Sequence, residues 1–475
     1  SREGAALFQT DSVRDQNRQR GSSPPRAREV RSTSSPAPGE LAAKVYGSGP
    51  RLRGTFQIAP CLIQQGGCCQ RAIPRSLRRA VSACLSHPHP TWVAFLLLTG
   101  SDPFFWFDSF IEVRLSIGQK FDGAHVHPGF DWLRLALAVG IFTFHSTTIT
   151  YGSADAIPPL LRAVARLLLP MFFALSGFLV TASLWRSQSV TLFLSLRVFR
   201  LLPALLAIVL MSTFVLGPLV TESSWQTYFS SNTLSQYLTN ALAQPHYQLP
   251  GVFLHNPRSG VVNGSLWTIP LELWCYTGLA IISLVGLTKH RHVLAILCLV
   301  SFAGIALADY AQYDLLAHLP TGDLALPFLA GIIIFAAATV LPLHGPLAII
   351  SLCAAMLLSM QPQGFALAML PLAYFVVWLG LQPLPSLPGD YSYGLYLVGY
   401  PIEQTYVAFF PGTAWWQSWA ACLPLALVCA VLLWHMVEKP ALSRRKFAAR
   451  AIARIWLPSV AGNPPKPNPA QFNRA

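Results

Sequence analysis

Two basic side chains occupy one strongly apolar stretch of the sequence, "FDWLRLALAVGIFTFHSTTITYG", at residues 130–152. Arg134 and His145 are eleven residues apart. In a helix they therefore lie within about 20° of one face and about 16 Å apart along the axis. A basic side chain at mid-bilayer costs about 2.5–3.5 kcal/mol on insertion scales. The pair indicates either function or two structural roles, in which Arg134 reaches lipid phosphates and His145 bonds a neighbouring helix.

Two further apolar stretches carry polar groups suited to chemistry. In "LRVFRLLPALL", Arg197 and Arg200 share a helix face at the cytosolic mouth of a span. Paired guanidinium groups suit phosphate oxygens, although ordinary cytosolic anchoring is the alternative. "NGSLWTIPLELWCY" places Glu272 about one and a half turns into a span entered from outside, at nearly the depth of His145. Since a carboxylate that orients an imidazole is a recurrent general-base arrangement, we expect Glu272 to contact His145.

The composition divides the chain into two parts. Hydrophobic residues make up 53% of the 475 and charged residues 11%, with a mean hydropathy of +0.47, whereas soluble domains have about 25% charged residues. Residues 1–114 nevertheless hold fifteen of the 33 Lys and Arg, in Ser-, Pro- and Arg-rich text. Because the first Met is Met171, we expect residues 1–112 to come from an over-extended gene model, with translation starting near Val113 or Leu115. A disordered basic leader is the alternative.

The remaining sequence predicts an all-α fold. Apolar stretches close to the ~20 residues that cross a bilayer recur about ten times, and they predict a polytopic membrane bundle of about ten transmembrane helices over residues 130–440, with a basic cytoplasmic tail at 441–475. The predicted spans are 131–150, 167–185, 198–220, 266–287, 292–308, 322–341, 345–360, 363–381, 392–410 and 416–436. Lys and Arg gather in alternate loops, so the positive-inside rule places both ends in the cytosol and the long polar connection 221–265 outside.

The net charge of +14 does not indicate nucleic-acid binding, because the basic residues lie in the leader, the short loops and the tail. The nine cysteines show no metal-ligand spacing, and those in apolar runs act as small hydrophobic residues. We therefore expect no metal site, no bound cofactor and no disulfide framework.

Five motifs in order resemble those of the acyltransferase-3 family, integral membrane proteins that O-acylate, mostly O-acetylate, surface glycans and some small molecules. The resemblance covers about residues 130–440. Its motifs are "FDWLRLALAVGIFTFHS", "FFALSGFLV", "LRVFRLLPALL", "NGSLWTIPLE" and "YSYGLYLVGYPIEQ". The residues that carry it are, in chain order, Arg134, His145, Ser176, Gly177, Arg197, Arg200, Trp267, Glu272, Ser392, Tyr393, Leu395, Tyr396 and Leu397. Two positions depart from the family pattern: Trp132 stands where a small residue is usual, and Glu403 where a neutral polar group is common.

The resemblance implies an acyl-CoA donor, mainly acetyl-CoA, on the cytosolic side of a bacterial inner membrane. It also implies a hydroxyl acceptor outside, on a carbohydrate or a small molecule. Arg134, Arg197 and Arg200 would hold the donor phosphates, while His145 would act as general base with Glu272 as its partner. An acyl-histidine relay is the rival scheme. The expected substrate-binding residues are Ser176, Asn263, Trp267, Tyr393, Tyr396 and Glu403.

Two other classes of protein compete with an enzyme. A transporter of glycans or lipids predicts two repeated halves with interrupted spans in matching positions, and the motif-rich stretches do not repeat. A non-catalytic assembly factor leaves the basic and acidic groups inside the spans unexplained. An O-acyltransferase is the interpretation that uses all of them.

Overall fold

The computed structural model describes residues 115–121, 127–187, 189–311, 324–361 and 363–444. They belong to one compact unit, and a second unit, Thr10–Trp106, lies outside the described residues. The predicted leader, 1–114, and residues 445–475 of the predicted tail also lie outside them.

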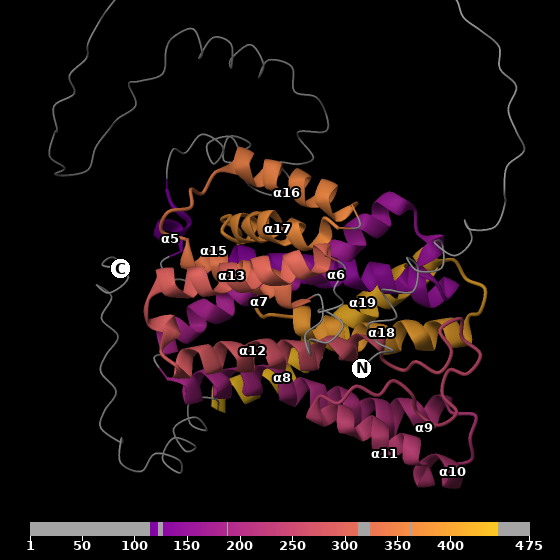
Figure 1. Ribbon diagram of the computed structural model, residues 1–475. Helices are drawn as coiled ribbons and strands as arrows, with labels where there is room; N and C mark the ends of the chain where they lie inside the picture. The colour runs from indigo at the N-terminus through magenta and orange to yellow at the C-terminus, as the bar shows by residue number, and fades with distance from the viewer. Residues whose placement is uncertain (1–114, 122–126, 188, 312–323, 362, 445–475) are drawn as a thin grey trace, which may run out of the picture. The chain divides into compact units, whose positions relative to one another are not determined.

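The described residues form helices and no strand, in agreement with the all-α prediction (Figure 1). The long helices are α6 (Pro128–Tyr151), α7 (Pro159–Ser187), α8 (Val190–Met211), α12 (Thr268–Leu284), α13 (Arg291–Tyr310), α15 (Ala325–Ala336), α16 (Gly345–Ser359), α17 (Phe365–Gly380), α18 (Ser392–Phe409) and α19 (Trp415–Leu433). The short ones are α5 (Ile117–Lys120), η1 (Ala154–Ala156), η2 (Ser212–Leu216), α9 (Gly217–Val220), α10 (Trp225–Ser230), α11 (Asn232–Leu238), η3 (Thr239–Leu242), η4 (Gly264–Trp267), η5 (Leu287–Lys289) and η7 (Trp434–Glu438).

Six helical segments among the described residues are long and apolar enough to cross a membrane. They are Pro128–Tyr151, Pro159–Ser187, Val190–Val220, Gly264–Leu284, Arg291–Tyr310 and Trp415–Arg444. The apolar helices α15, α16 and α17 are shorter. The count of about ten spans therefore stays a prediction.

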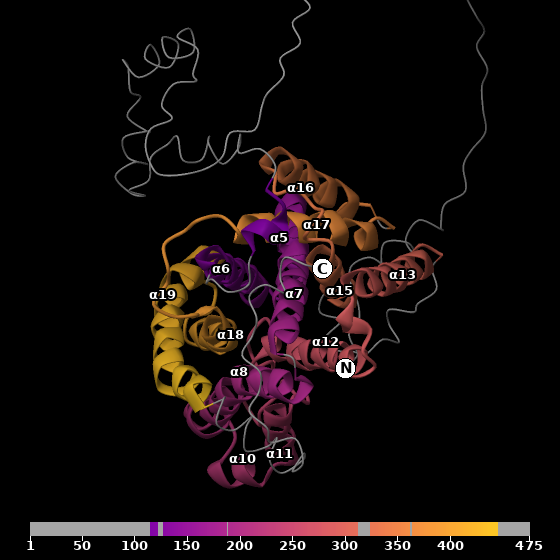
Figure 2. The ribbon, with the colours of Figure 1, turned by 90° about the vertical axis from the view of Figure 1, so that its left-hand side faces the viewer.

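Helix α7 lies in the middle of the bundle and packs against α6, α8, α15 and α17 (Figure 2). Its crossing with α15 is close, because a Cβ on Gly177 would collide with the carbonyl oxygen of Phe328, and one on Gly331 with that of Ala174. Small residues allow such approach between membrane helices. On the other side of the bundle, α18 packs against both α6 and α19.

Helix α8 begins at Val190, eight residues before the predicted start of the third span at 198. The Ser189 hydroxyl caps it by accepting from the N–H of Leu192. Arg197 and Arg200 therefore lie two to three turns inside the helix rather than at its mouth. The early start places both guanidinium groups within the bundle, where they need partners.

Pro401 lies inside α18 and lacks the amide hydrogen that would bond the carbonyl of Leu397. The side-chain amide of Asn263 donates to that carbonyl instead, at 2.9 Å. Asn263 is fully buried, and its oxygen accepts from the N–H of Ser265 as the N-cap of η4. This bond fixes the start of η4 and α12 against the middle of α18, inside the bundle.

The segment before η4 is held against the same helix. Gln404 of α18 donates to the carbonyl oxygens of Arg258 (2.9 Å) and Val261 (2.6 Å) and accepts from the Asn256 amide at 2.7 Å. The polar connection 221–265 is predicted to lie outside. Its last third instead enters the bundle alongside α18.

We expect Asn263→Ala to lower the free energy of unfolding by about 1–3 kcal/mol, because it leaves the buried carbonyl of Leu397 without a donor. In a Pro401→Ala background the same change should cost less, since the new N–H of residue 401 can bond Leu397. Thermal unfolding of the detergent-purified protein measures the four members of this cycle.

Asn232→Ala, at an exposed position of α11, is the matched control and should leave the unfolding midpoint unchanged. Equal costs of Asn263→Ala in both backgrounds would contradict the assignment.

Candidate active site

A cavity of about 120 Å³ opens between α6, α7, α8, α12 and α18, with room for several water molecules. Its walls combine charged and hydroxyl groups with aromatic and aliphatic side chains. Seven residues predicted from the sequence line it: Arg134, Ser176, Arg197, Arg200, Glu272, Tyr393 and Tyr396. We call this space the arginine cavity.

Arg200 is held by two carboxylates, one from each of two distant parts of the chain. Its Nη2 lies 2.5 Å from Asp390 Oδ2, just before α18, and its Nη1 lies 2.9 Å from Glu438 Oε2, at the end of η7. The ring of Trp434 also lies 5.8 Å from the guanidinium carbon. Arg200 is thus neutralised within the protein.

Arg134 shares one of these carboxylates. Its Nη1 lies 3.5 Å from Asp390 Oδ2 and 3.3 Å from Asp131 Oδ1 on its own helix. Burial alone would raise the pKa of the Asp390 carboxyl, but the charges of Arg200 and Arg134 outweigh it and hold that pKa below its ordinary value. Hydrogen bonds from the Ser392 hydroxyl (2.5 Å) and N–H (3.3 Å) act in the same direction.

Arg197 is in a different position, because no described carboxylate lies within ion-pair distance of it. Its Nη2 donates to Ser183 Oγ at 3.1 Å, and its guanidinium carbon lies 5.9 Å from the ring centroids of both Phe193 and Tyr276. Its Nε is buried without a hydrogen-bond partner in the described part of the chain. Of the three predicted arginines, Arg197 is the one whose charge is available to an anion.

Glu272 lies in the arginine cavity and accepts a hydrogen bond from the Tyr276 hydroxyl, one turn further along α12. Ser176 Oγ is 3.4 Å from the same hydroxyl. Glu272 therefore belongs with the arginines and the tyrosine rather than with the histidine.

His145 lies in a separate crevice, with its ring centroid 5.0 Å from that of Tyr400 in an edge-on arrangement. Its ring makes no hydrogen bond to any described residue, and the expected contact with Glu272 is not found. The reason is depth. Gly264 packs against the Tyr400 ring, and Glu272 follows it by eight residues, which is about 12 Å further into the bundle.

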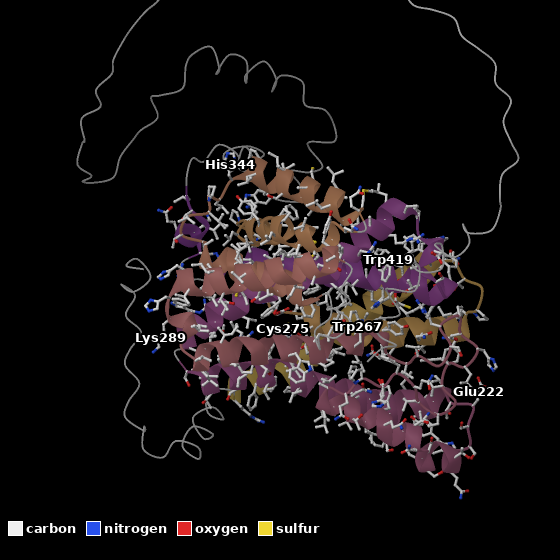
Figure 3. All side chains as sticks on the ribbon, in the orientation of Figure 1. Glu222, Trp267, Cys275, Lys289, His344 and Trp419 are labelled. Carbon is white, nitrogen blue, oxygen red and sulfur yellow. The ribbon has the colours of Figure 1, made fainter. Side chains whose placement is uncertain are left out.

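The predicted depth of Glu272 requires the span to start at the surface of the bundle. Figure 3 instead shows Trp267, near the start of this span, in the middle of the bundle.

Three predicted substrate contacts do not line the arginine cavity. Asn263 is occupied by its bonds within the fold, and Trp267 packs beside the core cluster that includes Cys275. Glu403 of α18 is fully buried against α6. Its carboxylate accepts a hydrogen bond from the hydroxyl of Ser146, the residue after His145. Direct substrate contact by these residues remains a prediction, whereas internal roles for Asn263 and Glu403 are visible.

Two acidic residues of the site were missed from the sequence, Asp390 and Glu438. Asp390 directly precedes the motif "YSYGLYL", and Glu438 lies two residues after the last predicted span, 416–436. Their presence could have been predicted from the arginines, because a buried arginine charge within a span requires a carboxylate partner.

The sequence profile of the acyltransferase-3 family, described as an acyltransferase domain, matches residues 127–435. The chain belongs to this family. It is also 26% identical over 341 residues to the O-acetyl transferase of Shigella phage Sf6, covering 66% of this chain and 96% of that protein. No solved structure gives a significant match.

This chain is a membrane O-acyltransferase. Its family and the similar O-acetyl transferase support the activity, and its long apolar helices support the membrane location. The resemblance inferred from the five motifs is confirmed, and the site therefore belongs to an acyltransferase fold.

We expect Asp390→Asn to lower the free energy of unfolding by roughly 3 kcal/mol, because it removes a buried charge shared by Arg200 and Arg134. The lowered pKa means that the carboxylate's contribution is complete above its unfolded pKa of about 3.9 and is lost only as the pH falls below it. The loss of stability relative to the unmodified chain should therefore be present throughout the range from pH 5 to pH 8 in thermal unfolding.

Asp155→Asn is the control, since Asp155 pairs with Arg162 at 3.0 Å but its side chain is 61% exposed. It should change stability by at most about 1 kcal/mol. Similar losses in both variants would show that Asp390 has no special role.

Proposed function

We propose that this O-acyltransferase moves an acyl group, chiefly acetyl, from acyl-CoA to a hydroxyl of an extracytoplasmic carbohydrate or related acceptor, with His145 as general base. The observation that carries the proposal is the shared wall between two spaces. Tyr396 lines both the arginine cavity and the crevice of His145. A donor held by the arginines is thereby brought next to the histidine.

The expected orientation follows from the charges at the two ends of the bundle. Lys289 and Glu222 lie at opposite ends in Figure 3. Arg291 lies over the ring of Trp185 at 5.4 Å, which places the start of α13 beside the end of α7. These basic connections favour the cytosol for the Lys289 end and for both chain ends. The family resemblance favours a bacterial inner membrane as the location.

The donor side of the proposal assigns different work to the three arginines. Arg197, without a carboxylate partner, would contact the donor phosphates, since guanidinium groups bind phosphate through charge-assisted bonds. Arg134 and Arg200 would shape the cavity and add positive potential while remaining paired. Glu272 and Tyr276 would line the path of the thioester arm, so that Glu272 acts on the donor side rather than on His145.

The chemistry balances without a further reactant. His145 removes the proton of the acceptor hydroxyl as its oxygen attacks the thioester carbon; the carbon–sulfur bond breaks, and the proton passes to the departing thiolate. The products are an ester and free CoA thiol.

His145→Ala should lower acyl transfer by about 10²–10⁴-fold, the usual contribution of a general base. The measurement is the acyl mass on surface glycans from a deletion strain complemented with each variant. His255→Ala is the control, because this exposed histidine pairs with Glu222 in the connection predicted to lie outside. Glycans from this variant should match those of the unmodified strain. Undiminished acylation with His145→Ala would remove the histidine from the mechanism.

Arg197→Ala should raise the KM for acyl-CoA by about tenfold to a hundredfold, the value of one charge-assisted hydrogen bond, with a smaller effect on kcat. The KM is measured with radiolabelled acetyl-CoA in inverted membrane vesicles. Arg162→Ala, which removes an arginine paired with Asp155, serves as the control and should leave the KM unchanged. A fall in kcat at constant KM would instead place Arg197 in the chemical step.

A further inference from the structure

Two opposite charges, Arg197 of α8 and Glu272 of α12, line the arginine cavity, yet no ion pair joins them in the described structure. The two helices pack against each other (Figure 1). Attraction between opposite charges is stronger inside a protein than in water. An arginine and a carboxylate that share a buried space therefore pair unless another group holds one of them.

Tyr276 contacts both of these groups, one through its ring and the other through its hydroxyl. The guanidinium carbon of Arg197 lies over the ring, 5.9 Å from its centroid. The hydroxyl donates a hydrogen bond to Oε1 of Glu272. Since Glu272 precedes Tyr276 by four residues, this bond runs along one face of α12. The carboxylate is thereby held against its own helix, while the guanidinium group rests on an aromatic face.

The tyrosine side chain is fixed from two sides. Tyr276 is buried, with 4% of its surface exposed, and its ring meets that of Phe193 edge-on with the centroids 6.5 Å apart. Ser176 Oγ lies 3.4 Å from the tyrosine hydroxyl. A phenol has one hydrogen to donate and an oxygen that can accept. With the serine as donor to that oxygen, the tyrosine hydrogen is directed to Glu272.

We propose that Tyr276 is a positioning residue of the donor site: its hydrogen bond keeps the Glu272 carboxylate away from Arg197 and so leaves the guanidinium group free for the phosphates of acyl-CoA. This inference rests on the function proposed above. Without the hydroxyl, Glu272 turns toward Arg197 and pairs with it. The donor must then displace a carboxylate before its phosphate can bind.

The test is Tyr276→Phe, which keeps the ring beneath Arg197 and removes only the hydroxyl. KM and kcat for radiolabelled acetyl-CoA are measured in inverted membrane vesicles that contain the full chain. Because the released carboxylate competes with the donor for one charged group, the KM should rise by about tenfold or more, with a smaller effect on kcat.

Two double variants separate this role from a general effect on structure. Once Glu272→Gln is present, adding Tyr276→Phe should leave the KM unchanged, because the amide carries no charge to neutralise the guanidinium group. Once Arg197→Ala is present, adding Tyr276→Phe should likewise have no further effect on the KM, since the cation is gone. Non-additivity of this kind in both cycles is the signature of a role exerted through these two partners.

Tyr374→Phe is the matched control. Tyr374 is buried to nearly the same degree, with 5% of its surface exposed, and its hydroxyl donates to the carbonyl of Pro342 at 2.6 Å. It belongs to a different core cluster and does not line the arginine cavity. Its KM should equal that of the unmodified chain.

An unchanged KM in Tyr276→Phe, or an equal rise with and without Glu272→Gln, would overturn the role of Tyr276 and leave the proposed function intact. The proposed donor site would fail separately, if Arg197→Ala itself left the KM unchanged. A folded, unmodified chain that transfers no acetyl group from acetyl-CoA would refute the proposed function.

Discussion

The neutralisation of Arg200 is the interaction on which the site depends. An arginine buried among apolar helices is costly unless its charge is paired and its donors are bonded. Asp390 and Glu438 supply this pairing from the segment before α18 and from the end of η7. Through the shared Asp390, Arg134 of α6 joins the same network. These ion pairs hold together four segments that are far apart in the sequence. They thereby fix the positions of α6, α8 and α18, which form walls of the arginine cavity.

This network also decides which arginine can serve a ligand. A donor phosphate that bound Arg200 would have to displace Asp390 or Glu438, and it would meet their negative charge. Arg197 carries no such cost, because its partners are a serine hydroxyl and two aromatic faces. Three arginines that look equivalent in the sequence therefore separate into two that build the site and one that is open to substrate.

The sequence predicted the convergence of Arg134, Arg197 and Arg200, since periodicity and family motifs place each on an inward helix face. It did not predict the partners of Arg200, because Asp390 and Glu438 are 190 and 238 residues away from it. The predicted pairing of His145 with Glu272 was not found, because the span that carries Glu272 starts in the middle of the bundle. That start is fixed by the bond from Asn263 to the carbonyl that Pro401 leaves free and by the bonds of Gln404, and no periodicity in the sequence predicts them.

Helix α18 connects the parts of the site because its functional residues follow one face. Tyr393 and Tyr396 line the arginine cavity, Tyr396 and Tyr400 line the crevice, and Glu403 holds Ser146 beside His145. The spacings of three, four and three residues place all four on one helical stripe. Asn263 and Gln404 fix the depth of this helix relative to the entering segment. A rotation of α18 would therefore displace the donor path, the crevice and the histidine together. The buried polar contacts along the length of α18 prevent such a rotation.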